Sequence, residues 1–169
     1  MMDYLSAELK AYYQSDLEEN VITLQDDYWK FDEELSALIT LINQHPGLQT
    51  LYSRSYSPQR SGLDLNPLSY LKIAYTREMR LPLGKALVGV HDALNGPESP
   101  VEVNEEPPQD NLNYRSDKYG GMGCLDDPNY FYIWHFYISI RSEKVEMHRQ
   151  FWSLLGDKFS GLLAHEKRS

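Results

Sequence analysis

The cysteine and the histidines are the residues whose types best suit catalysis. Cys124 is the only cysteine in the chain, and it follows a glycine-rich stretch at 120–123. A cysteine nucleophile needs a histidine base close to it in space, and His91 and His135 are the candidates. No spacing in the sequence brings either histidine to the thiol, and a lone cytosolic cysteine usually serves as a small inert side chain. We therefore predict that Cys124 is not catalytic.

Carboxylate pairs are the candidate ligands for a metal ion. Asp26-Asp27 and Asp126-Asp127 offer the oxygen atoms that hard cations prefer, but neither pair lies in a calcium-loop pattern. Asp126-Asp127-Pro128 has turn chemistry instead, and no His-x-x-x-His or Glu-x-x-His spacing occurs. The glycine run at 120–123 lacks the lysine and serine that end a phosphate-binding loop. We predict that the protein uses no metal ion and no organic cofactor, and that it is not an enzyme.

The remaining candidates for chemistry fall on apolar stripes. His135 shares a predicted strand face with Phe131, Ile133 and Tyr137, and His148 lies on the apolar stripe of a predicted helix. Such histidines are usually buried and hydrogen-bonded within the core. For the same reason core packing is the predicted role of the three tryptophans, Trp29, Trp134 and Trp152.

Acidic residues are concentrated at the start of the chain. Residues 1–34 hold ten acids against Lys10 and Lys30, a local charge of −8 within a total of −9. Such a field repels nucleic acids and membrane surfaces and attracts basic proteins, although a charge run can also be only a solvated helix face. Five of these acids flank a β-branched segment at 21–24. They are the predicted partner-binding residues: Asp16, Glu18, Glu19, Asp26 and Asp27.

Three helical stripes and one strong strand must position these residues. The spacing of apolar residues predicts helices over 3–14, 28–42 and 145–162, the second ended by His45-Pro46-Gly47 and the third capped by Ser142. Aromatic and β-branched residues at 130–140 predict a central strand. A further strand is predicted at 48–56, with a loop at 57–61, and the segment 21–24 is a strand or continues a helix.

Two regions are less sharply patterned. Residues 68–94 fit both a helical and an alternating period, so both readings stay open. Residues 95–128 hold five of the nine prolines and form a long loop-rich segment, with edge strands predicted near 101–103 and 112–114.

Length and composition give the setting. The 169 residues suit one domain, 1–169, and strands followed by returning helices predict an α+β fold with a mainly antiparallel sheet against two or more amphipathic helices. Neither a basic leader nor an apolar run long enough for a membrane helix is found, and one cysteine excludes an internal disulfide. We expect a cytoplasmic protein, and the sequence does not determine its oligomeric state.

The order of elements resembles a known class of proteins. It comprises Val21 to Trp29, a helix ending near His45-Pro46-Gly47-Leu48 with Leu51-Tyr52 after it, then Leu83-Gly84 to Asn95-Gly96, glycines before Cys124, Pro128-Asn129 entering an apolar strand, and a final helix. This order resembles the immunity proteins of bacterial polymorphic toxin systems. The resemblance implies a small cytosolic α+β protein without catalytic residues that binds and blocks one cognate toxin.

Three functions are compatible with these observations. The first is an immunity-type inhibitor that covers a basic toxin, such as a nuclease, with its acidic N-terminal third. The second is a small enzyme that uses Cys124 or a carboxylate pair, and the third is a structural or assembly adaptor of a phage or secretion apparatus. The charge asymmetry and the resemblance favour the inhibitor.

Overall fold

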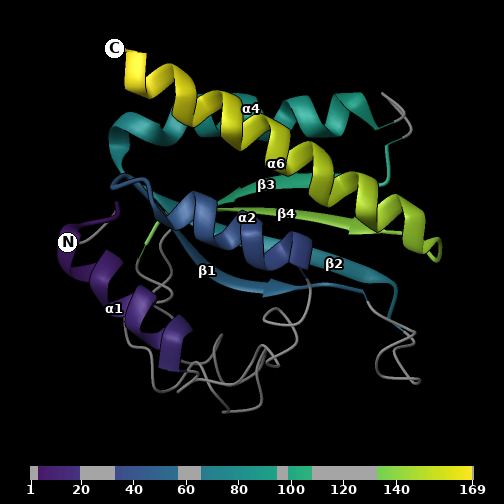
Figure 1. Ribbon diagram of the computed structural model, residues 1–169, viewed down its shortest axis with the longest axis horizontal. Coiled ribbons are helices and arrows are strands. Elements are labelled where there is room, and N and C mark those ends of the chain that lie inside the picture. Colours follow the sequence, from purple (N-terminus) through teal and green to yellow (C-terminus); the bar gives the residue numbers. More distant parts are fainter. Residues whose placement is uncertain (1–3, 20–32, 57–65, 95–98, 108–132, 169) are drawn as a thin grey trace.

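The computed structural model describes residues 4–19, 33–56, 66–94, 99–107 and 133–168. Within these ranges a four-stranded antiparallel sheet has the order β1-β2-β4-β3 (Figure 1). The strands are β1 (Leu48–Arg54), β2 (Leu68–Tyr75), β3 (Val101–Glu106) and β4 (His135–Arg141). The helices are α1 (Ala7–Glu19), α2 (Glu33–Asn43), the short 3-10 helix η2 (Arg77–Met79), α4 (Arg80–Ala93) and α6 (Val145–Arg168). The predicted α+β class is confirmed.

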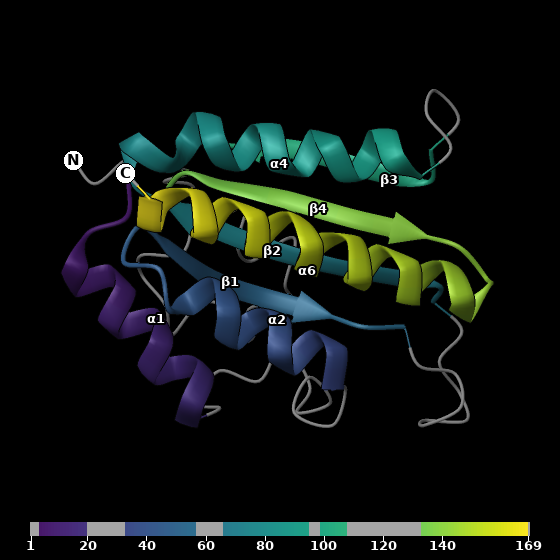
Figure 2. The same ribbon diagram turned by 45° about the horizontal axis from the view of Figure 1, so that its top comes forward.

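Three helices, α2, α4 and α6, cover one face of the sheet (Figures 1 and 2). Side chains alternate along a strand, so Phe136, Ile138 and Ile140 of β4 all face these helices. The C-terminal helix α6 supplies Phe151, Leu155 and Phe159, which are completely buried, and it contacts both α2 and α4. The main core therefore lies between the sheet and these three helices.

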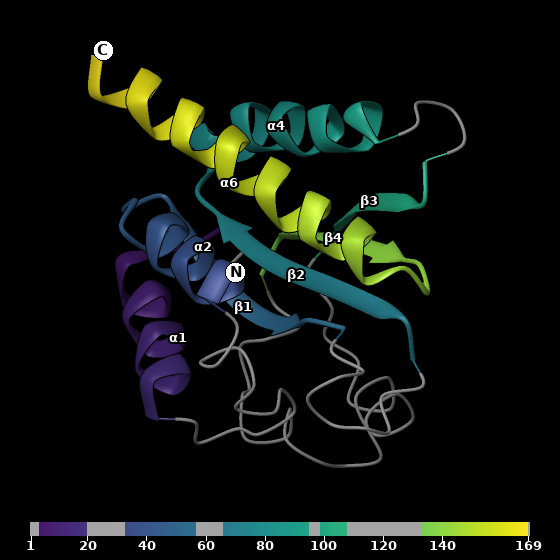
Figure 3. The same cartoon turned by 45° about the vertical axis from the view of Figure 1, so that its right-hand side comes forward.

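The other face of the sheet carries α1, which contacts β1 and in Figure 3 lies near α2, away from α4. Its buried side chains repeat at intervals of four residues, at Leu9, Tyr13 and Leu17. The helix predicted over 3–14 extends to Glu19, because its stripe of buried side chains continues to Leu17. A smaller apolar cluster on this side joins α1 to β1, β2 and the start of β4: Leu5, Leu9, Tyr13, Leu51, Tyr52, Ala74 and Ile133.

The strand predicted at 130–140 is confirmed as an interior strand from His135 on, because β4 pairs with both β2 and β3, but Ile133 and Trp134 precede it. The strand at 48–56 and the edge strand near 101–103 are also confirmed. The helix predicted over 28–42 is described from Glu33, and it ends before His45-Pro46-Gly47 as expected. The segments 21–24, 57–61, 112–114 and 130–132 lie outside the described residues.

Residues 68–94 combine the two alternatives that the pattern left open. The first part is strand β2, in which Leu71 and Ile73 face the helices and Lys72 faces the other side. Asn66-Pro67, a pair that suits the start of a helix, here precedes a strand. The second part is helix α4, with Leu83, Leu87 and Val90 buried at helical spacing. In the described ranges, no helix combines the length and the apolar composition that crossing a membrane requires.

Trp134 is less buried than a core residue of its size would be. It is partly exposed, stacks on Tyr4 with ring centres 6.4 Å apart, and has the Arg80 guanidinium 5.9 Å from its ring centre. Trp152 lies in the core, is 3% exposed and donates from Nε1 to Ser55 Oγ at 3.2 Å, while Trp29 lies outside the described residues. Trp134 stands just before β4 begins and packs against the main core without being fully buried.

Two glycines should respond in opposite directions to alanine. A Cβ on buried Gly47 would lie 2.8 Å from Met79 Cγ and 2.9 Å from Thr76 Oγ1, so Gly47→Ala must displace the β2–η2 connection. A Cβ on Gly161 in α6 meets nothing within 4 Å. We expect Gly161→Ala to raise the free energy of unfolding by about 0.5–1 kcal/mol through helix propensity, and Gly47→Ala to lower it by about 1–3 kcal/mol. Urea unfolding of both variants measures this, and equal effects would contradict it.

Candidate functional site

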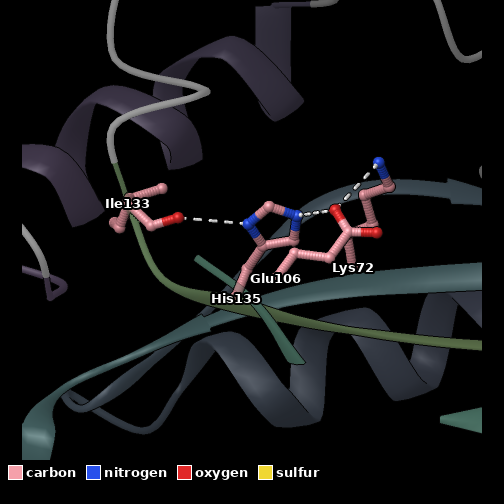
Figure 4. Close-up of polar contacts among 4 residues, drawn as sticks. All are labelled: Lys72, Glu106, Ile133 and His135. Atoms are coloured by element: carbon pink, nitrogen blue, oxygen red, sulfur yellow. Dashed lines mark hydrogen bonds and ion pairs between the residues drawn. The ribbon is translucent and has the colours of Figure 1, made fainter. Parts of the chain in front are cut away.

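A polar cluster joins β2, β3 and β4 on the face opposite the three helices (Figure 4). His135 Nε2 lies 2.8 Å from Glu106 Oε2, and His135 Nδ1 lies 3.2 Å from the Ile133 carbonyl oxygen. Lys72 Nζ lies 4.0 Å from the same Glu106 oxygen and 5.5 Å from the centre of the Tyr137 ring. Glu106 is directly opposite His135 in the sheet, and Lys72 is directly opposite Tyr137. The cluster fastens the end of β3 to the start of β4.

The His135 ring is held by its neighbours on both sides. Both nitrogens face an oxygen atom, Nε2 the Glu106 carboxylate and Nδ1 the Ile133 carbonyl, so both lie within hydrogen-bond distance of a partner in the fold. The residue is 2% exposed. A general acid or base needs a nitrogen within reach of its substrate, whereas both nitrogens here are already engaged. The prediction of a hydrogen-bonded core histidine is confirmed for His135.

His148 forms a second buried arrangement, with Ser69. Its Nε2–H donates to the Ser142 carbonyl oxygen at 2.6 Å, so Nδ1 accepts the Ser69 hydroxyl at 2.7 Å. Ser69 Oγ in turn accepts the Tyr56 backbone N–H at 2.8 Å. A serine bonded to a histidine is also the arrangement of a nucleophile and its base. Ser69, however, is completely buried and its oxygen already accepts that N–H, so the pair connects β2 to the segment before α6.

The prediction for His148 is likewise confirmed, whereas Ser69 was not predicted. Its partner His148 is 79 residues away in sequence, and no local pattern marks such a pair. Ser142, the predicted cap of the last helix, accepts the Lys144 backbone N–H on its Oγ at 3.1 Å, just before α6 begins.

Lys10 links α1 to the end of α2 and the start of β1. Its Nζ donates to the Asn43 carbonyl oxygen at 2.9 Å, to the Leu48 carbonyl oxygen at 2.6 Å and to Gln49 Oε1 at 3.0 Å. These three neutral oxygens match the three N–H donors of an ammonium group. Because burial removes water from the charged form, it lowers the pKa of Lys10 to about 8. Gln14 extends the network, since Gln49 Nε2 donates to Gln14 Oε1 at 3.1 Å.

The same network closes the outer edge of β1. Thr50 N–H donates to Asn43 Oδ1 at 2.8 Å, and Gln49 Nε2 lies 3.3 Å from the Thr50 carbonyl oxygen. Leu48 N–H donates to the His45 carbonyl oxygen at 3.2 Å, while the Leu48 carbonyl oxygen accepts Lys10. Side chains and a turn therefore occupy the backbone groups that this edge would offer to another strand.

The predicted partner-binding acids are only partly within the described chain. Positions 16, 18 and 19 lie near the C-terminal end of α1, while Asp26 and Asp27 lie outside the described residues, as do Cys124 and Asp126-Asp127. Lys10, which stands among these acids in the sequence, directs its hydrogen bonds to neutral oxygens.

His91, a candidate base in the sequence, lies on α4 with Nδ1 3.0 Å from Asp92 Oδ1. The described ranges contain no group of three histidine, cysteine or acidic side chains arranged to hold a metal ion. Comparisons with protein-family models, with curated proteins and with solved structures found no match to this chain.

The lowered pKa of Lys10 predicts a specific pH dependence. The folded value of about 8 lies below the ordinary value of 10.5, so between them the folded state binds fewer protons and rising pH favours folding. We expect the free energy of unfolding to rise from about pH 8 to about pH 9.5, and this rise to be lost in Lys10→Met. The window stays below 10.0, because burial and then Glu105 raise the pKa of Tyr75, whose effect on stability has the opposite sign above that value.

Urea unfolding at a series of pH values measures the slope for each variant. Lys144→Met, which removes an exposed lysine, is the matched control and should keep the slope of the unaltered protein. Equal slopes in Lys10→Met and Lys144→Met would contradict the assignment.

Proposed function

We propose that this protein is an immunity-type inhibitor that binds a basic toxin domain, such as a nuclease, in the cytoplasm. Its acidic N-terminal segment, residues 1–34, makes the contact through five acids: Asp16, Glu18, Glu19, Asp26 and Asp27. The observation that carries the proposal is the charge distribution, with −8 of the total −9 in residues 1–34. A concentrated field of one sign speeds the encounter with a partner of the opposite sign and disfavours other partners.

The way α1 is held supports this proposal. The helix packs on β1 through Leu9 and Tyr13, Leu17 joins the main core, and Lys10 bonds the helix to α2 and β1. A helix fixed in this way loses little conformational entropy when its acidic end meets a partner. The three hydrogen bonds of the Lys10 ammonium go to neutral oxygens, so in these contacts Lys10 does not form an ion pair with the acids.

A nuclease is a suitable target because its substrate groove must attract phosphates. Such a groove is positive, and an acidic protein surface competes with the nucleic acid for it. The buried histidines also favour binding over catalysis as the role of this chain. Both ring nitrogens of His135 and of His148 are engaged within the fold.

A growth assay tests the function. The protein encoded next to this chain in its source genome, expressed alone, should arrest growth, and co-expression of this chain should restore it. A neighbouring product that is harmless, or whose toxicity is unchanged by this chain, would contradict the proposal.

The acidic face is tested by association rates with that neighbouring product. We expect charge reversal of the five acids to lysine to slow association by about tenfold or more at low salt and to flatten its salt dependence, because screening acts beyond about 8 Å at physiological ionic strength. Dissociation should change less. The matched control reverses five exposed acids elsewhere and so changes the net charge equally: Glu78, Asp92, Glu143, Glu146 and Asp157.

If both sets of substitutions slow association equally, the effect depends on the total charge of the protein and not on the acidic face. If neither set alters association, the contact surface lies elsewhere on the protein. Either result contradicts the acidic face as the binding site.

A further inference from the structure

The two edges of the sheet are finished in different ways. At β1 the outward backbone groups of Leu48 and Thr50 are occupied by Lys10, Asn43, Gln49 and the turn at His45. At the other edge, β3 pairs with β4 on one side only within the described part of the chain. An exposed strand edge is a template for another strand unless charge, proline or a side chain blocks it.

The alternation of backbone groups identifies which atoms of β3 point outward. The Pro100 carbonyl oxygen accepts the Arg141 N–H at 3.4 Å, so residues 102, 104 and 106 also direct their backbone groups toward β4. The groups of Val101, Val103 and Glu105 then face outward. Val101 N–H is bonded to Ser99 Oγ at 3.2 Å. Within the described ranges, nothing pairs with the outward N–H and C=O groups of Val103 and Glu105, which an added strand would bond.

A groove of about 640 Å³ runs beside this edge, between β3 and α4. Its apolar lining comes from both elements and from the neighbouring strand: Leu81, Gly84, Val88, Val103 and Phe136. Leu81 is 78% exposed and Val88 is 49% exposed, and these are the large exposed apolar side chains of the described chain. Gly84 keeps the floor open, because a Cβ there would lie 3.1 Å from Phe136 Cζ.

We propose that this edge and groove bind an extended segment of a partner protein, which pairs with β3 as an added strand. The segment has β-branched or other apolar residues at alternate positions, directed into the groove between β3 and α4. Its backbone bonds the outward groups of Val103 and Glu105. Main-chain hydrogen bonds of this kind give affinity, and side-chain pockets beside the edge give sequence preference.

Charge defines the intervening positions of the segment. On the face opposite α4, β3 carries the exposed Glu102 and Asn104, so the residue opposite Glu102 is best lysine or arginine. Glu106 is engaged by His135 and Lys72. On the groove side Glu105 is already paired with Arg80, at 2.8 Å, and Lys85 is the other charge of the wall. A second copy of this chain is a poorer occupant, because its β3 brings glutamates toward glutamates.

This inference goes beyond the proposed function and does not depend on it. The edge at β3 and the edge at β1, where α1 packs, are opposite ends of the sheet. Loss of the acidic face would leave the β3 groove intact, and the reverse also holds.

The test uses the full chain and a short synthetic peptide that alternates lysine and valine. We expect the peptide to slow amide hydrogen exchange at Val103 and Glu105, while Asn104, whose N–H faces β4, changes little. A peptide of the same composition with its lysines and valines in separate blocks should bind at least about tenfold more weakly, because only alternation separates the two faces of a strand. Equal binding of the two peptides would overturn the proposal.

Variants locate the site. Val103→Pro removes an outward N–H and is tolerated at a strand edge, so it should abolish peptide binding without loss of the fold. Val88→Lys on the exposed face of α4 should weaken binding by about tenfold, and it is the second test if Val103→Pro does not fold. Ala93→Lys, an exposed position near the end of α4, adds the same charge and should have no effect.

Binding that is unchanged in Val103→Pro and Val88→Lys would overturn the proposal. So would a concentration-dependent dimer of the protein alone that Val103→Pro dissociates, since the occupant would then be a second copy.

Discussion

The hydrogen bonds of the Lys10 ammonium are the interaction on which the N-terminal half depends. A buried ammonium group must find an acceptor for each of its donors, and Lys10 finds them on the last turn of α2 and on the first two residues of β1. One side chain thereby places α1 on one side of β1 and ends α2 on the other. The side-chain amides of Asn43 and Gln49 bond the outward backbone groups of Thr50. With Lys10 they block strand pairing at the start of the β1 edge.

Sequence patterns predicted the elements whose burial has one clear period. Apolar residues lie on a single face of α6 and on both faces of β4. These two patterns therefore predicted the α+β class. Residues 68–94 fit both a helical and a strand period, because the positions of Leu71, Ile73, Leu87 and Val90 suit either. The pairing of residues 68–75 with β1 and β4 determines that this part is strand β2. The contacts of Lys10 with Asn43 and of Ser69 with His148 join residues at least 33 positions apart, beyond any local signal.

The polar residues of the described chain are used largely to hold elements together. His135 joins β3 to β4, His148 joins β2 to the start of α6, and Lys10 joins α1 to α2. Each of these side chains exchanges hydrogen bonds to water for hydrogen bonds within the protein. The free-energy cost of this exchange is small only when every donor and acceptor has a partner. His135, a candidate base in the sequence, and His148 therefore hold elements of the fold in place. What remains for recognition is the surface charge and the unfinished edge at β3.

The closed edge at β1 also bears on how the chain folds. His45, Asn43 and Gln49 occupy the other outward groups of Leu48 and Thr50, but the Leu48 carbonyl oxygen is bonded by Lys10 only after α1 has docked. Until then this part of the β1 edge is incompletely closed, and partly folded chains with open edges associate with one another. Docking of α1 is thus the step that removes one route to aggregation, and opening of α1 in the native state would restore it.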